Sequence, residues 1–205
     1  MNHLPRKSPL LRTEALLLLC GSALSACVQA LWSVSYSVEG ADSTMAHFIT
    51  PGPGDAVLLA GYISLPGDPQ TFLPQGTAYV AQYSGRGQLD WRYTPDDQSS
   101  FAGVTSLDRA PDGSLYFSDI RVQDTVLTRL DANGQKIWEY RRPQKEDLFN
   151  PELALRVKVV NDNLILLGLT EQYGSAATPP GTLLALDGAG TLLWQFHGIG
   201  SGPYD

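Results

Sequence analysis

Groups that could do chemistry are sparse in this chain of 205 residues, which holds three histidines and two cysteines. His3 lies in a basic N-terminal leader. His47 and His197 are far apart and form neither an H-x-x-x-H nor an H-E-x-x-H pair, the spacings expected of a zinc site. A lone histidine near a strand is more often structural than a metal ligand. Because the chain also lacks the G-x-S-x-G turn of a serine nucleophile, the sequence predicts no catalytic residue.

Carboxylates are more numerous, at 21, but they are scattered. Asp131 and Asp187 stand at the first position of predicted turns, where a carboxylate accepts hydrogen bonds from backbone N–H groups. A calcium site needs several oxygen ligands together, and the best candidates are the pairs Asp96–Asp97 and Asp119–Asp124. Each pair is equally compatible with a solvated loop, so we predict neither a metal nor a cofactor.

The N-terminal residues have the pattern of a secretory signal peptide. A basic head with Arg6, Lys7 and Arg12 precedes an apolar run of about a dozen residues that ends in small side chains. A transmembrane helix needs about 20 apolar residues, which makes a retained membrane helix the weaker alternative. The sequence thus predicts an exported protein.

The segment LSAC at the end of this run resembles the lipobox of bacterial lipoproteins. The resemblance implies that signal peptidase recognises Leu24, Ser25 and Ala26 and removes residues 1–26. The thiol of Cys27 would then carry the lipid as a thioether, and several acyl chains anchor a protein far better than one chain does. Val28 stands where an Asp would imply retention at the inner membrane, so the resemblance implies the outer membrane, on its periplasmic or its surface side.

The mature part, residues 27–205, is acidic. Loss of the leader removes three basic residues and one acidic residue from a chain of net charge −7, which leaves −9. An acidic surface argues against nucleic acid and anionic lipid headgroups as partners. The part contains no second cysteine, so an exported domain of this length must be stabilised by its core rather than by disulfides.

A repeat organises the mature part, and the tryptophans reveal it. Three segments align without a gap: YSGRGQLDWRY at 83–93, LDANGQKIWEY at 130–140 and LDGAGTLLWQF at 186–196. Each has Ser or Asp, then a turn glycine (Gly87, Gly134, Gly190), then a tryptophan (Trp91, Trp138, Trp194) and an aromatic residue two positions later. Trp32 precedes a similar strand near the lipobox. Strand-forming residues before a glycine turn predict a β-hairpin in every copy.

A second hairpin precedes each of these, with its turn near 54–55, 112–113 or 161–162. In each case a continuous apolar run follows the turn, as at 57–60, 115–117 and 164–167, which predicts a strand buried on both faces. Each repeat is therefore four antiparallel strands, and we place the repeats at about 41–93, 101–140 and 153–196. Short strands at this period are typical of β-propeller blades.

The hairpins resemble the bacterial β-propeller repeats grouped as SBBP and PQQ-like, over nearly the whole mature part. Ala185, Asp187, Gly190 and Trp194 follow the PQQ-like signature, but the turn is one residue shorter and lacks its Thr, which favours the SBBP-like pattern over a true quinoprotein. Residues 112–130 also resemble a blade of the NHL type. These families share an all-β propeller fold and do not share one function.

About three blades are present, whereas a closed ring needs about four to eight. Two alternatives stay open: a piece of a longer propeller, or an arc that closes by self-association. The strand at 31–38 is expected to be the outer strand of a further blade. We expect the tryptophans to pack between blades rather than to form a sugar-binding surface, and Trp194 to be exposed if the next blade is missing.

We expect a non-enzymatic, membrane-anchored scaffold of the cell envelope that binds another protein. The long loops at 62–76, 141–152 and 170–181 are the expected contact sites. The alternative is a fragment of a propeller enzyme, either quinoprotein-like or sugar- or lactone-processing. The sequence does not identify a small-molecule ligand.

Overall fold

The computed structural model describes residues 41–66, 75–96, 103–121, 124–142, 152–171 and 181–198. Within these ranges the chain is all β, with three antiparallel sheets of four strands each and no helix. The all-β prediction is confirmed at this level. None of the described residues belongs to a helix that could span a membrane.

Each sheet is a meander in which the strands pair in chain order. Sheet 1 contains β1 (Ser43–Pro51), β2 (Val57–Leu65), β3 (Gln75–Tyr83) and β4 (Leu89–Tyr93). Sheet 2 contains β5 (Val104–Arg109), β6 (Leu115–Arg121), β7 (Asp124–Leu130) and β8 (Lys136–Arg142). Sheet 3 contains β9 (Glu152–Asn161), β10 (Leu164–Glu171), β11 (Gly181–Leu186) and β12 (Leu192–His197).

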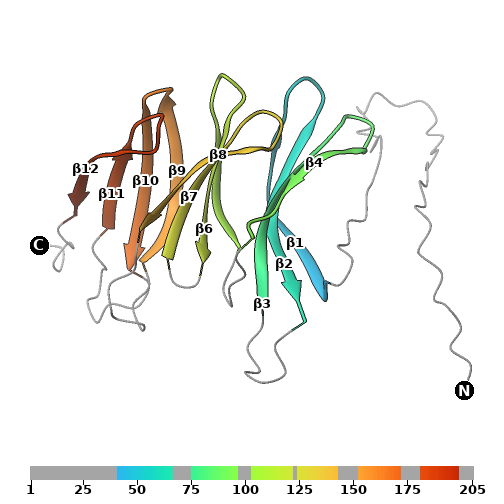
Figure 1. Cartoon of the computed structure of the whole chain (residues 1–205), viewed down its shortest axis with the longest axis horizontal. Helices are drawn as coiled ribbons and strands as arrows, with labels where there is room; N and C mark the ends of the chain where they lie inside the picture. The colour runs from blue at the N-terminus through green and yellow to red at the C-terminus, as the bar shows by residue number, and fades with distance from the viewer. Residues whose placement is uncertain are drawn as a thin grey trace, which may run out of the picture.

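The three sheets stand side by side in chain order, with sheet 2 in the middle (Figure 1). Two apolar cores join them. One core includes Leu58 and Val80 of sheet 1 with Phe117 and Leu130 of sheet 2. The other joins Tyr116 and Leu127 of sheet 2 to sheet 3, chiefly through β9 and β10. Stacked sheets of this kind are compatible with propeller blades.

The middle sheet shows why its sequence is so continuously apolar. Leu115, Tyr116 and Phe117 of β6 are at most 1% exposed, because sheets pack against both faces of this strand. Successive side chains of a strand point to opposite faces of the sheet. Leu115 and Phe117 therefore contribute to the core with sheet 1, and Tyr116 contributes to the core with sheet 3.

The two end sheets differ. The face of sheet 1 that points away from sheet 2 is already buried, with Ile63, Tyr79, Ala81 and Tyr83 at most 3% exposed. At the other end of the stack, every residue of β12 is exposed. The stack therefore has one covered end and one uncovered apolar strand.

Candidate functional site

The turn that joins the last two strands of each sheet is built in the same way. Gly87, Gly134 and Gly190 have φ angles of 76°, 79° and 84°, a left-handed conformation that favours glycine. Oδ1 of Asp131 accepts hydrogen bonds from the N–H groups of Asn133 and Gln135, each at 2.8 Å. Ser84 and Asp187 occupy the same position and accept the equivalent pairs of bonds.

A β-bulge directly after each turn aims the tryptophan. The regular register breaks one residue before Trp91, Trp138 and Trp194, which pair with Gln82, Arg129 and Ala185 of the preceding strand. A bulge bends a strand and redirects the next side chain. We call the face of each sheet that carries its tryptophan the forward face, and the opposite face the rear face.

The forward tryptophan of one sheet lies on the turn glycine of the next. A Cβ added to Gly134 would lie 2.4 Å from Cε3 of Trp91, and one added to Gly190 would lie 2.9 Å from Cδ2 of Trp138. Only glycine leaves room for an indole ring at this distance. The repeated glycine thus has two roles, because it permits the turn conformation and receives the neighbouring tryptophan.

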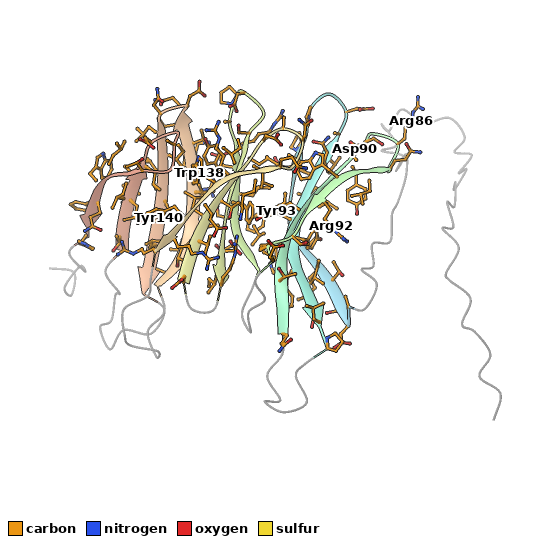
Figure 2. The ribbon with its side chains drawn as sticks, in the orientation of Figure 1. Arg86, Asp90, Arg92, Tyr93, Trp138 and Tyr140 are labelled. Atoms are coloured by element: carbon orange, nitrogen blue, oxygen red, sulfur yellow. The ribbon has the colours of Figure 1, made fainter. Side chains whose placement is uncertain are left out.

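Trp138 adds a polar contact to this stacking. Its Nε1 donates a hydrogen bond to the carbonyl of Gly188 at 3.0 Å, and Nη1 of Arg129 donates to the same oxygen at 2.7 Å. Arg129 lies over the ring of Tyr116, 5.3 Å from its centroid, and Tyr116 meets Trp138 edge-on at 5.8 Å. Figure 2 shows Trp138 and Tyr140 on the side of β8 that faces sheet 3.

Sheet 3 carries the same forward pair with nothing described in front of it. Trp194 is 46% exposed and Phe196 is 60% exposed, whereas the equivalent pairs Trp91–Tyr93 and Trp138–Tyr140 pack against the next sheet. Leu183 and Ala185 of β11 pair with Phe196 and Trp194, so they lie on the same face. Ala185 is completely buried, and we call the half-buried Leu183 and the exposed Trp194 and Phe196 the open forward face.

A buried ionic cluster lies on the rear face of sheet 2. Arg121 donates from Nε to Asp119 at 2.7 Å, from Nη1 to Glu139 at 3.0 Å and from Nη2 to Thr128 at 2.9 Å. The side chains of Arg121 and Asp119 are 1% and 0% exposed. The solvated loop considered for Asp119 is therefore wrong, because β6 extends to Arg121 and places both side chains in the interface with sheet 1.

The environment of this cluster shifts two pKa values. Burial raises the pKa of Tyr93, which Figure 2 shows between sheets 1 and 2, to about 12, although the nearby Arg121 opposes the shift. Burial alone would raise the pKa of Glu139, but hydrogen bonds from Arg141, Lys136 and Arg121 outweigh it and lower that pKa below its ordinary value of 4.5. The carboxylate of Glu139 is thus held in its charged form.

The other groups singled out in the sequence are not brought together. Nδ1 of His197 lies 3.1 Å from Oγ1 of Thr182 in sheet 3, while His47 belongs to β1 of sheet 1. In the part of the chain that the structure describes, no three His, Cys, Asp or Glu side chains are grouped as a metal would need. Asp97 lies outside the described residues.

The predicted anchor also lies outside the described residues, as do Leu24, Ser25, Ala26, Cys27 and Trp32. So do the central parts of the three long loops. The residues that sequence reasoning missed are Arg129, Arg121 and Glu139. An Asp-x-Arg spacing in a strand could have indicated the Asp119–Arg121 pair, because side chains two positions apart point to the same face of the sheet.

Comparisons with known proteins identify no family. No family model and no curated protein matches the chain. Among solved structures, a protein of unknown function from Bacteroides caccae is similar with 13% sequence identity and a TM-score of 0.40. The match covers 67% of this chain and 40% of the other, so this chain spans less than half of that structure's length.

Proposed function

We propose that the protein is a lipid-anchored, non-enzymatic scaffold of the bacterial cell envelope, which binds another protein through its stacked sheets. The open forward face is the observation that carries this proposal. Soluble proteins rarely expose contiguous aromatic and aliphatic side chains unless the patch meets a partner. Trp and Phe are also enriched in the buried centres of protein interfaces.

Several charged side chains of the described residues are engaged in bonds within the protein, which supports binding rather than catalysis. Arg121 donates hydrogen bonds to both Asp119 and Glu139. Arg129 is engaged by a carbonyl of the next sheet and by Asp112 at 3.0 Å. The bonds of Arg121 tie strands of sheet 2 together, and Arg129 joins sheet 2 to sheet 3. A scaffold needs that rigidity to present a surface.

The anchor supports the same proposal from the sequence. A thioether lipid on Cys27 would hold the acidic domain beside the membrane without a spanning helix. Residues 28–40 would then join the anchor to the first described strand. A protein fixed in this way meets membrane-associated partners at a raised local concentration.

Metabolic labelling tests the anchored scaffold. The chain, expressed in a Gram-negative bacterium, is expected to incorporate labelled palmitate and to sediment with the outer membrane. Cys27→Ala is expected to lose both properties, while Cys20→Ala, placed inside the leader, keeps them. Palmitate incorporation that persists in Cys27→Ala, or a chain that stays in the cytoplasm, would contradict the proposal.

A further inference from the structure

The rear face of sheet 1 is buried, although none of the other described strands packs against it. Ile63, Tyr79, Ala81 and Tyr83 are at most 3% exposed, and among the described residues their cluster contains only side chains of sheet 1 and Ala41. In sheets 2 and 3 the preceding sheet covers the rear face and places a tryptophan on the turn glycine. A tryptophan is therefore expected on the rear face of sheet 1 as well.

Trp32 has the right spacing in the sequence to be this tryptophan. The interval from a tryptophan to the first residue of the second strand in the following sheet is 24 residues from Trp91 to β6. It is 26 residues from Trp138 to β10, and 25 residues from Trp32 to β2. The register of Trp32 relative to sheet 1 thus matches that of the other two tryptophans relative to sheets 2 and 3 within one residue.

The residues that follow Trp32 have the pattern of a strand with one apolar face. In the segment WSVSYSVE at 32–39, Trp, Val, Tyr and Val alternate with three serines and a glutamate. Strict alternation of this kind predicts a strand that is buried on one face only. Strand β8 is divided in the same way, because Trp138 and Tyr140 pack against sheet 3 while Glu139 bonds to Arg121 on the other side.

The path of the chain allows this segment to cover sheet 1. Ala41 packs against the rear cluster, and the N–H of Asp42 donates to the carbonyl of Ser64 at 2.9 Å. Ser64 lies opposite the first residues of β3, whereas Gly87 lies in the turn at the other end of that strand. Trp32 is nine residues before Ala41, and an extended strand of that length covers about 30 Å. Because β3 is itself nine residues long, the indole ring can reach Gly87.

We infer that residues 31–38 form a strand on the rear face of sheet 1, with the indole ring of Trp32 on Gly87. The φ of Gly87 is 76°, and this residue occupies the same turn position as the two glycines that receive a tryptophan in sheets 2 and 3. Further strands can lie beside residues 31–38 in the same sheet without changing this contact.

The docked strand also fixes the place where the proposed lipid anchor joins the domain. Cys27 is five residues before Trp32, and five residues reach about 18 Å at most. The lipid is then held beside the β3–β4 turn of sheet 1, rather than at the end of a free linker of residues 28–40. Only this placement of the lipid rests on the proposed function, because the packing of Trp32 does not require lipidation.

Fluorine NMR of the full chain, labelled with 5-fluorotryptophan, tests the contact. Each resonance is assigned by a single Trp→Phe substitution, and its solvent isotope shift reports the exposure of that ring. We expect a small isotope shift for Trp32, close to that of Trp91. The 46% exposed Trp194 provides the large shift of an exposed ring.

Gly87→Ala is expected to move the Trp32 resonance and to increase its isotope shift, because the new Cβ would lie against the indole ring. Gly134→Ala is the matched substitution and should act on Trp91 instead. Gly54→Ala is the control for backbone strain, since its φ is also left-handed but nothing lies within 4 Å of its added Cβ. This control should leave the Trp32 resonance unchanged.

The placement of the lipid has its own measurement in detergent micelles. A spin-labelled detergent is expected to broaden the resonance of Trp91, which belongs to sheet 1, more than that of Trp194 in sheet 3. Equal broadening of the two resonances in the lipidated chain would overturn this placement.

Two outcomes would overturn the docking of residues 31–38. One is an isotope shift of Trp32 as large as that of Trp194, a result that needs no substitution at a glycine. The other is a Trp32 resonance that ignores Gly87→Ala while Gly134→Ala moves Trp91, since another segment would then cover Gly87. A chain that incorporates no palmitate but shows a buried Trp32 would refute the proposed anchor and leave the docking intact.

Discussion

The indole ring of Trp138 lies on Gly190, the turn glycine of the following sheet, and Nε1 of the same ring bonds to the carbonyl of Gly188 at 3.0 Å. Trp91 and Gly134 stand in the same relation one sheet earlier. The tryptophan repeat is therefore a contact between neighbouring repeats and not only a feature of each hairpin.

Alanine at the covered glycines is expected to destabilise the protein more than alanine at an uncovered one. Gly54→Ala should cost about 1–2 kcal/mol of unfolding free energy, because its φ of 60° is left-handed while nothing lies within 4 Å of its added Cβ. Gly134→Ala and Gly190→Ala should cost about 1–3 kcal/mol more, since the Cβ would overlap an indole. Urea unfolding measures all three, and equal losses would contradict the stacking.

Truncation of the tryptophans is expected to separate packed rings from the exposed one. Trp138→Ala should cost about 3–5 kcal/mol, in the range for large aromatic residues that pack in a core. Trp194→Ala should cost roughly 1 kcal/mol, near the average for point substitutions. Trp138→Phe keeps most of the ring but loses the bond to Gly188, and should cost about 1 kcal/mol or slightly more. A Trp194→Ala loss as large as that of Trp138→Ala would disprove the assignment.

Removal of the Arg121 charge is expected to leave Asp119 buried without its ion pair. Arg121→Met should therefore cost about 3–5 kcal/mol. The double variant Arg121→Met with Asp119→Leu should recover most of this loss, because the buried carboxylate that bonded Arg121 is removed as well. Lys136→Met is the control, since its 3.2 Å bond to Glu139 is exposed and should contribute less than about 1 kcal/mol. Additive losses in the double variant would show that the two side chains are not coupled.

Acid is expected to destabilise the protein through Glu139, which bonds Arg121, Lys136 and Arg141 within sheet 2. The folded protein lowers the pKa of this carboxyl below 4.5, so the unfolded chain binds its proton first. Its contribution to stability is present above that ordinary pKa and is lost as the pH falls through the folded value. Glu139→Gln should flatten the fall of unfolding free energy between about pH 5 and pH 3. An identical pH profile for the variant would contradict this role.

Much of the fold was predictable because its signals are local. The spacing from Ser84, Asp131 and Asp187 to the glycine and the tryptophan indicates the outer hairpin, and the structure forms one in each sheet. Apolar runs such as 115–117 indicate strands covered on both faces. The propeller itself stays a prediction, because the stacking of three sheets is a property of distant residues and does not define a closed ring.

The polar contacts were harder to predict because they depend on pairing between strands. Asp119 and Arg121 are close in sequence, but Glu139 reaches them only because β7 and β8 follow β6 in the same sheet.

The turn between β7 and β8 of sheet 2 also depends on a residue that is distant in the sequence. Ala132 occupies the position that Gly85 and Gly188 occupy in the other two turns. Ala132 lies against Gly113 of the preceding hairpin, where an added Cβ would lie 3.2 Å from the Cβ of Ala132. The size of one residue depends on its neighbour in another hairpin.

Hydrogen exchange of the indole N–H groups tests the central claim, that each tryptophan is covered by the next sheet and the last is not. The indole N–H resonances are assigned in the full chain by single Trp→Phe substitutions. We predict slow exchange for Trp138, whose N–H is bonded to Gly188, slow exchange for the buried Nε1 of Trp91, and exchange close to that of a free peptide for Trp194. Protection of Trp194 equal to that of Trp138 in the monomeric chain would contradict the account.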